Sequence, residues 1–569
     1  MRRPKKNLTA FAGMTLIGLL IAFAAFWLVI LRTGIAADYF HIMAFCCILL
    51  GFLTVVLTAF LVFVRRCSIA RIYPVLAICL GVLTYFVLSV YTKPDDTHHL
   101  ASAYVLSNRM LQTVSDEGNI ITTRRACDDL LEQFVDGDIG DRQMLFLSED
   151  TYNMIGSWFA PTEDTELVAA KLTKYKGGSA FPYLMGAFGI TAARLLGLNF
   201  GWAALFGSLL QMFFFVGTMT YAIRRTPIGK QMFFVFGLLP IVLQQTASFS
   251  YDCAVLSGCV LVTALSLRWA CDREEREKRA EGHPAALREK AVDALMFLLA
   301  ALLLFTAKGG IYGPLIFLPL LLLFKRSWLK SARNRWILAG GILLIILGVL
   351  YYLFGMGGWS NIEYQLNYEY YNVFTGESGF SILYYLQHPG RFLWLFFHTL
   401  HVRGIIYLKE LVGGFLGWYR NIVISWKVLI CFYVLLFLAL FRQKEDRAEL
   451  PLRFRALFLF IAAAYDGLMM AIMEVRWSVD AWNEIDGVQG RYFLPTLPLA
   501  LLAIGFWQRR ERGRKGVLSE KIAGCFSRIV PLKQQVGELP PVPESIFPAG
   551  MVLLDVLVLC VCVWMTTLG

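Results

Sequence analysis

Long apolar runs separated by short polar segments make up most of this 569-residue chain. A helix needs about twenty apolar residues to cross the ~30 Å of hydrocarbon in a bilayer, and most of the runs approach that length. We therefore predict an all-α integral membrane fold with about thirteen transmembrane helices. The predicted spans lie near residues 8–31, 42–64, 73–91, 200–223, 231–249, 253–270, 291–308, 311–324, 336–355, 422–441, 454–473, 492–507 and 548–566.

Basic residues between the runs orient these spans. Lys and Arg residues precede the first run, within residues 2–6, and such residues favour the cytoplasmic side of a membrane. With this end in the cytoplasm, the later basic clusters also fall inside, and the C-terminus falls outside. The first run is too long for a cleaved signal peptide, so we predict an uncleaved span. The same topology places residues 93–199 in one large outer loop.

One apolar run, residues 181–196, has a different interpretation. If it crossed the membrane, Arg224 and Arg225 would fall outside and every later basic cluster would invert. We therefore predict a helix that lies on the outer surface, with Pro182 in its first turn and Arg194 near its end. Elsewhere in the outer loop, the pattern predicts a helix over Asp96–Thr113 and an irregular, acidic segment over 115–170.

The composition supports a polytopic membrane protein rather than a soluble enzyme with an anchor. Hydrophobic residues make up 57% of the chain and charged residues 17%. Lys and Arg exceed Asp and Glu, but they lie in short clusters between spans, which indicates topology and not a nucleic-acid partner. The cysteines lie mostly within apolar runs, so we expect neither a disulfide framework nor a zinc site. Four parts follow: two N-terminal spans (1–72), a membrane domain (73–508), a cytoplasmic linker (509–546) and a C-terminal span (547–569).

Chemically distinctive residues fall at the outer ends of separate spans in this topology. They are Asp95, Asp96, His99, Asp252, Lys308, Trp418, Gln489, Arg491 and Tyr492. Ionisable groups are costly inside lipid, so such residues form either ordinary solvated loops or the rim of a site. Each type has a simpler interpretation: aspartates cap helices, a lysine extends to the headgroups, a histidine lies on the surface, and aromatic residues form an interfacial belt. Carboxylates, cations and aromatic rings at one face are nevertheless what a site at the membrane surface needs.

Several motifs carry a resemblance to a known family. They are PDDTHH at 94–99, SFSYD at 248–252, HPGRF at 388–392, GGFLGW at 413–418 and GVQGRYFLP at 487–495. Over roughly residues 73–508 the chain resembles an uncharacterised bacterial family of polytopic membrane proteins with PDE-H, SYD and GVQGRY motifs, related to the GT-C glycosyltransferases. The resemblance implies a GT-C-like bundle with a large outer loop and interfacial helices, which takes sugars from polyprenyl-phosphate carriers. Two positions depart from the family: its Asp-Glu pair is Asp95-Asp96 here, and Trp418-Tyr419-Arg420 replaces an acidic residue that follows Gly-Trp-Leu.

The chemistry of such a transfer defines roles for these residues. A carboxylate must take the proton of the attacking hydroxyl, and cations must hold the departing phosphate. Asp95 or Asp96 is the expected base. Arg491 and Lys308 are the expected phosphate ligands, with Arg491 favoured because its planar fork can hold two phosphate oxygens. The remaining candidates for substrate binding are His99, which orients the carboxylate or contacts the acceptor, and Asp252, Gln489 and Tyr492.

We therefore expect a glycosyltransferase of a bacterial cell membrane, acting at the outer face. Its partners would be a polyprenyl-phosphate-linked sugar, a glycan or lipid acceptor and membrane lipids. The sequence contains no nucleotide-binding fingerprint and indicates no certain cofactor or metal ligand, and it leaves a divalent cation open. A transporter or flippase of lipid-linked saccharides is the alternative, although we find no internal repeat of the kind that transporters show. A structural subunit would leave the outer charges without a purpose.

Overall fold

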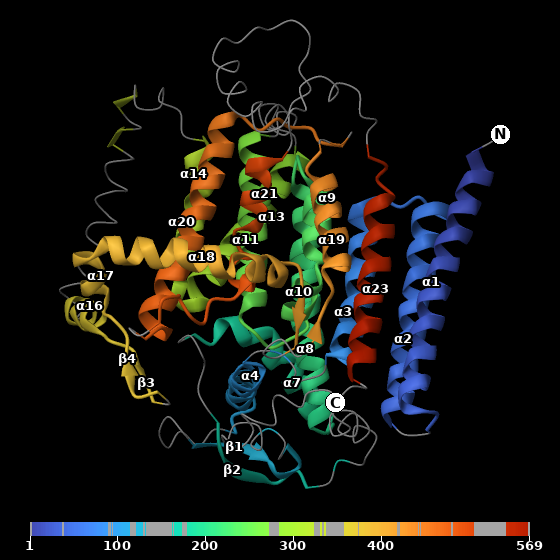
Figure 1. Cartoon of the computed structure of the whole chain (residues 1–569), viewed down its shortest axis with the longest axis horizontal. Helices are drawn as coiled ribbons and strands as arrows, with labels where there is room; N and C mark the ends of the chain where they lie inside the picture. Colours follow the sequence, from blue (N-terminus) through green and yellow to red (C-terminus); the bar gives the residue numbers. More distant parts are fainter. Residues whose placement is uncertain are drawn as a thin grey trace, which may run out of the picture.

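The computed structural model in Figure 1 is mostly helical. It describes residues 3–36, 39–88, 93, 95–113, 121–128, 131, 162, 164–172, 179–271, 284–323, 331–332, 335–336, 358–373, 375–417, 422–441, 443, 445–479, 482–505 and 542–566. Within these residues, seven helices are long and apolar enough to cross a membrane. These are Asn7–Thr33, Phe40–Val64, Ile69–Val87, Phe200–Arg225, Asp252–Cys271, Leu452–Trp477 and Ile546–Met565.

The helices form one bundle with α11 at its centre. The elements of the bundle are α1 (Arg3–Thr33), α2 (Tyr39–Ala59), α3 (Ile69–Val87), α8 (Phe200–Arg225), α11 (Asp252–Cys271), α13 (Pro284–Thr306), α14 (Leu318–Leu323), α19 (Trp426–Ala439), α20 (Leu452–Trp477), α21 (Leu497–Ile504) and α23 (Ile546–Thr566). α11 packs against α8, α13 and α14, and it is the most enclosed of the candidate spans. α1, α2 and α23 pack against one another at one side of the bundle, where α23 also contacts α3 and α19 (Figure 1).

Several predicted spans are shorter or divided in the structure. The run 231–249 forms α9 (Lys230–Gly237) and α10 (Pro240–Thr246), because Pro240 has no N–H and begins a new helix. The run 492–507 begins as the 3₁₀ helix Gly490–Phe493 and continues as α21. The run 336–355 lies almost wholly outside the described residues. The structure thus supports a helical membrane bundle, and the number of thirteen spans stays a prediction.

The predicted outer loop contains α4 (Asp96–Met110), which confirms the helix expected over 96–113. Leu100 and Tyr104 are buried on one side of it, as the apolar spacing indicates. The segment expected to be irregular contains two strands, β1 (Ile121–Arg125) and β2 (Leu167–Lys171), which pair antiparallel. We call the end of the bundle that carries α4 and this pair the loop end; it is at the bottom of Figure 1.

A buried ion pair attaches the strands to the bundle. The guanidinium of Arg125 donates to both carboxylate oxygens of Asp128, at 2.8 and 2.9 Å, and Tyr104 of α4 donates its hydroxyl to the same carboxylate. Arg125 also donates to the carbonyl oxygen of Leu198, just before α8. A buried charge pair is tolerated where hydrogen bonds satisfy it in this way, so the strands have a fixed position against α4 and α8.

The run 181–196 forms the 3₁₀ helix Phe181–Tyr183 and then α7 (Leu184–Leu195), with Pro182 in the first turn and Arg194 near the end as expected. Twelve residues of helix span ~18 Å, too short to cross the hydrocarbon. α7 packs closely against the part of α8 at the loop end, where a Cβ at Gly189 would overlap the backbone of Phe206 (Figure 1). The short length of α7 and its place at the loop end agree with an interfacial position.

A second region crosses the bundle after the undescribed residues 337–357. It contains α16 (Gly358–Asn367), β3 (Tyr371–Asn372), β4 (Glu377–Ser378), α17 (Ile382–Gln387), α18 (Pro389–Leu411), β5 (Phe415–Leu416) and β6 (Ile422–Val423). β3 pairs with β4 and β5 with β6, both antiparallel. α18 runs across the axes of α20 and α21 in Figure 1, and it packs against the 3₁₀ helix Gly490–Phe493.

Candidate functional site

The structure brings together charged residues that are far apart in the sequence. Nη2 of Arg491 lies 3.9 Å from a carboxylate oxygen of Asp95, and Nζ of Lys308 lies 2.6 Å from a carboxylate oxygen of Asp252. Asp252 and Arg491 also line one small crevice. We call these four residues the charge cluster. It lies at the loop end, at the first turns of α4 and α11 and just after α13.

Lys308 is held between aromatic rings as well as beside a carboxylate. Its ammonium lies 5.5 Å from the ring centre of Tyr251 and 4.9 Å from that of Tyr492, so both rings add cation–π attraction. Lys308 has a left-handed backbone (φ 48°), and Gly309 continues in the same region (φ 65°). A left-handed backbone is strained in a residue that has a Cβ. Such strained residues occur often at functional sites. Tyr492 thus lies against Lys308 of the charge cluster, and its role in substrate binding stays a prediction.

Arg491 owes its position to a close approach of two backbones. A Cβ built at Gly490 would overlap the carbonyl oxygen of Tyr407 in α18, so only glycine fits there. The N–H of Gly490 donates to Glu410 of α18 at 2.6 Å. These contacts explain why a glycine directly precedes the arginine in the GVQGRY motif. Gln489 is half-buried before this glycine, and its carbonyl oxygen accepts the N–H of Tyr492.

The two adjacent aspartates have different environments. The Asp95 side chain is 34% exposed and lies at the cap of α4, where its backbone is left-handed (φ 60°) and its side chain does not cap the helix. Asp96 is 1% exposed, and its carboxylate accepts the N–H of Phe249 at 2.9 Å. Asp96 thereby joins α4 to the SFSYD segment, whereas Asp95 lies beside Arg491.

A buried lysine that the sequence reasoning overlooked supports the same junction. Lys93 donates from its ammonium to the carbonyl oxygen of Ala247, and it lies 5.3 Å from the ring centre of Tyr85. Burial lowers the pKa of Lys93 to about 8, and the nearby Asp96 opposes that shift. The sequence feature that could have identified Lys93 is its position directly before Pro94-Asp95-Asp96, since a lysine beside two carboxylates is expected to interact with them.

His99 is buried, which rejects the interpretation of an exposed surface histidine. Its Nδ1 lies 2.9 Å from the hydroxyl of Tyr183, and its ring packs edge-on against Tyr251 at 4.7 Å. His99 therefore connects α4 to the 3₁₀ helix that precedes α7 and to a ring that also contacts Lys308. Burial raises the pKa of Tyr183, so this phenol keeps its proton as a hydrogen-bond donor.

The crevice of the charge cluster contains another residue that we did not predict, Gln245. The crevice is lined by Gln245, Asp252, Leu256, Arg491, Leu494 and Pro495. Gln245 is buried, and neither its Nε2 nor the Nε of Arg491 has a hydrogen-bond partner among the described residues. Buried donors of this kind are costly unless a ligand or water satisfies them. The sequence feature that could have identified Gln245 is the polar stretch Gln244–Asp252, which follows an apolar run.

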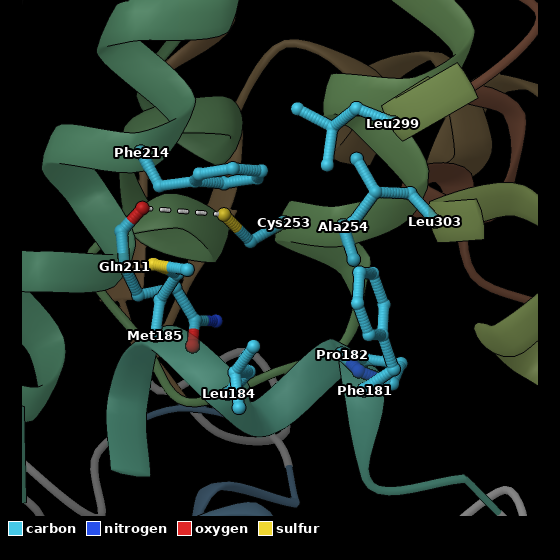
Figure 2. Close-up of a pocket in the computed structure, with 10 residues that line it drawn as sticks. All are labelled: Phe181, Pro182, Leu184, Met185, Gln211, Phe214, Cys253, Ala254, Leu299 and Leu303. Atoms are coloured by element: carbon cyan, nitrogen blue, oxygen red, sulfur yellow. Dashed lines mark hydrogen bonds between the residues drawn. The ribbon is translucent and has the colours of Figure 1, made fainter. Parts of the chain in front are cut away.

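A larger pocket lies on another face of α11, away from the charge cluster. It is wider than the crevice of the charge cluster. Figure 2 shows its mainly apolar lining from the 3₁₀ helix before α7, α7, α8, α11 and α13. Cys253 follows Asp252 by one residue but points into this pocket, where its thiol donates to the carbonyl oxygen of Gln211. The two faces of the first turn of α11 therefore differ in chemistry.

Two further predictions concern Trp418 and metals. Trp418 lies outside the described residues. Among the residues that are described, no group of three or more His, Cys, Asp and Glu side chains could hold a metal ion. In the charge cluster, the carboxylates of Asp95 and Asp252 each lie beside a cation. Both carboxylates that could serve as oxygen ligands of a divalent cation are therefore already beside a positive charge.

Comparisons with known proteins agree with a membrane protein. The model of a family described as Predicted membrane protein (DUF2142) matches residues 76–500. That range contains α4, α11, α18 and the whole charge cluster, and it leaves out α1, α2 and α23. Neither the curated proteins nor the solved structures give a match.

Proposed function

We propose that this chain, which belongs to the DUF2142 family of predicted membrane proteins, transfers a sugar from a polyprenyl-phosphate carrier to a cell-surface polysaccharide or lipid acceptor. The observation that carries the proposal is the pair formed by Asp95, which is partly exposed, and Arg491, which is buried, at 3.9 Å. A proton acceptor beside a fixed cation is what transfer from a lipid phosphate needs. The GT-C resemblance of the motifs points to the same reaction.

The reaction assigns one role to each side of the charge cluster. The acceptor oxygen forms a bond to the anomeric carbon of the sugar, and the bond from that carbon to the phosphate oxygen breaks. Polyprenyl phosphate leaves with the electron pair, and the hydroxyl proton passes to Asp95. Arg491 and Lys308 hold the phosphate as its charge increases, and the unpartnered donors of Arg491 and Gln245 face the same crevice.

We assign the base to Asp95 and not to Asp96. Asp96 is buried and its carboxylate already accepts a backbone N–H, so it cannot approach an acceptor hydroxyl without breaking the junction to Phe249. Asp95 is accessible, and its partner Arg491 can exchange the carboxylate for a phosphate group. In this assignment Asp96 is a positioning residue, together with Lys93 and His99.

A transporter or flippase of lipid-linked saccharides is the second candidate, and one observation favours it. Transporters bind substrates at discontinuous helices, and the run 231–249 is divided into α9 and α10 beside the site. The Gly417 N–H donates to Gln244 of α10 at 2.9 Å, so the interruption is attached to the segment after α18. Binding without transfer would be the expected behaviour of a transporter.

The test uses the full chain reconstituted in vesicles with radiolabelled polyprenyl-phosphate sugars. Transfer predicts label in a polysaccharide or lipid acceptor together with release of polyprenyl phosphate, and Asp95→Asn should slow both by ~10²–10⁴. The exposed loop residue Glu166 offers a matched control, because Glu166→Gln removes a carboxylate far along the chain from the cluster. Movement of intact donor across the bilayer, with no transfer by the wild type, would favour the transporter instead.

A further inference from the structure

We propose that α18 lies in the plane of the membrane, with its apolar face inserted among the lipid acyl chains beside α20. The exposed face of α18 carries Leu393, Phe397, Leu400, Ile405 and Leu408. Phe397 is 64% exposed and Ile405 61%, values that are unusual for large apolar side chains facing water. The spacing places these residues on one side of the helix.

The opposite side of α18 is buried in protein. Leu395, Thr399, Tyr407 and Glu410 are all enclosed, and the helix contacts α20 and the 3₁₀ helix Gly490–Phe493. α18 is therefore amphipathic in an unusual sense, because Thr399 and Glu410 face the protein, whereas the exposed side is mainly apolar apart from His401. A helix with such a face needs an apolar environment to cover it.

Lipid is the occupant that the neighbouring surface indicates. α20 is a candidate membrane span, and its Leu459, Phe460 and Leu468 are exposed in the same way. α18 packs directly against α20, so its apolar face continues a surface that faces hydrocarbon in any membrane-spanning arrangement. Although α18 has 23 residues, it is not apolar enough to be a candidate span, and it runs across α20 in Figure 1. These observations favour an in-plane position over a crossing one.

The first turns of α18 carry groups that suit the polar boundary of a membrane. The guanidinium of Arg391 lies 5.1 Å from the ring centre of Trp394, which in turn stacks on His398 at 4.8 Å. Trp side chains favour the interface, and an arginine near a helix end can extend its charge towards headgroups. The other end of the helix supports the charge cluster, because Tyr407 and Glu410 hold Gly490, which precedes Arg491. Lipid contact along α18 would thus stabilise the segment that carries Arg491.

Spin labels on the full-length protein in phospholipid vesicles test this position. Cys46 and Cys431, the exposed cysteines among the described residues, are first replaced by serine, together with Cys127 and Cys525 of the polar segments. Single Phe397→Cys and Leu408→Cys variants are then labelled with a nitroxide, and collision rates with oxygen and with a water-soluble nickel chelate are measured. We expect both labels to favour oxygen and to lie at the same depth. Glu369→Cys, at an exposed position just before β3, is the control and should favour the nickel chelate.

Three outcomes would overturn the proposal. A Phe397 label that favours the nickel chelate would place the face in water. Low access to both reagents, with broadening from a second label, would show that another copy of the chain covers α18. Because residues 397 and 408 are about 16 Å apart along a helix, a depth difference of that size would mean that α18 crosses the bilayer.

Discussion

At the scale of single residues, the neighbours Asp95 and Asp96 differ in what they contact. If Asp95 is the base, Asp95→Asn should lower the rate of sugar transfer by ~10²–10⁴ and leave the fold and lipid binding nearly intact. Asp96→Asn keeps an oxygen that can accept the Phe249 N–H, so it should retain most of the activity. The measurement is turnover of labelled donor by the two variants, with thermal unfolding as the control for folding. An active Asp95→Asn, Asp96→Asn double variant would refute the assignment.

The second residue-scale prediction concerns Arg491. Arg491→Lys keeps the positive charge but loses the planar fork, so it should weaken both phosphate binding and turnover. Binding is measured with polyprenyl phosphate that carries no sugar, which separates affinity from the chemical step. Unchanged binding together with unchanged turnover would show that Arg491 only neutralises Asp95.

Lys93 provides a pH test. Its pKa is lowered by burial to about 8 from an ordinary value of 10.5, so between these values the unfolded chain binds a proton that the folded chain does not. Stability should therefore rise as the pH increases from about 8 to 10.5. Lys93→Met should remove this contribution, and Ala247 would still accept a hydrogen bond from Ser208 at 2.7 Å. The measurement is the melting temperature of the wild type minus that of Lys93→Met, which should increase from pH 8 to 10.5. A difference that stays constant with pH would contradict the prediction.

At the scale of elements, the junction between α18 and the 3₁₀ helix Gly490–Phe493 gives the next prediction. Gly490→Ala adds a Cβ that overlaps the Tyr407 carbonyl oxygen, so it should cost about 1–3 kcal/mol of stability and displace Arg491. Gly404→Ala is the matched control within α18, because nothing lies within 4 Å of its added Cβ and alanine favours a helix. The melting temperature should therefore fall in Gly490→Ala and stay equal or rise in Gly404→Ala, each relative to the wild type.

The sequence predicts some elements of this fold much better than others, for physical reasons. Uninterrupted apolar runs give α1, α2, α3, α8, α11, α20 and α23, because length alone identifies a span. Pro240 was visible inside the run 231–249, but the run's hydrophobicity hid its division into α9 and α10. The strands of the loop end and the crossing direction of α18 depend on contacts between distant segments, such as Arg125 with Leu198, which a single sequence does not contain.

The sequence also predicts some features of the candidate site and not others. The membrane topology predicted that Asp95, Asp252, Lys308 and Arg491 share one end of the bundle, and the structure places all four in one cluster. It did not predict which carboxylate pairs with which cation, because that depends on helix rotation. Gln245 was missed because the predicted span 231–249 included the start of the polar stretch Gln244–Asp252.

At the scale of the whole molecule, orientation in the membrane remains a prediction from charge. The basic clusters predict Cys127 outside and Cys525 inside. On intact cells, a membrane-impermeant thiol reagent should therefore label Cys127, and labelling should disappear in Cys127→Ser. Labelling of Cys525 while Cys127 is protected would invert the topology and place the charge cluster on the cytoplasmic side.

The pairing within the charge cluster also implies a link between ligand binding and protons. Each cation there has a carboxylate beside it, so a phosphate that enters the buried crevice brings negative charge without a free positive partner. A dry site resists such an excess, and the simplest relief is that a group nearby takes up a proton as the ligand binds. The buffer supplies that proton. The heat of binding of polyprenyl phosphate should then change with the ionisation enthalpy of the buffer, even though no chemical bond of the lipid is made or broken.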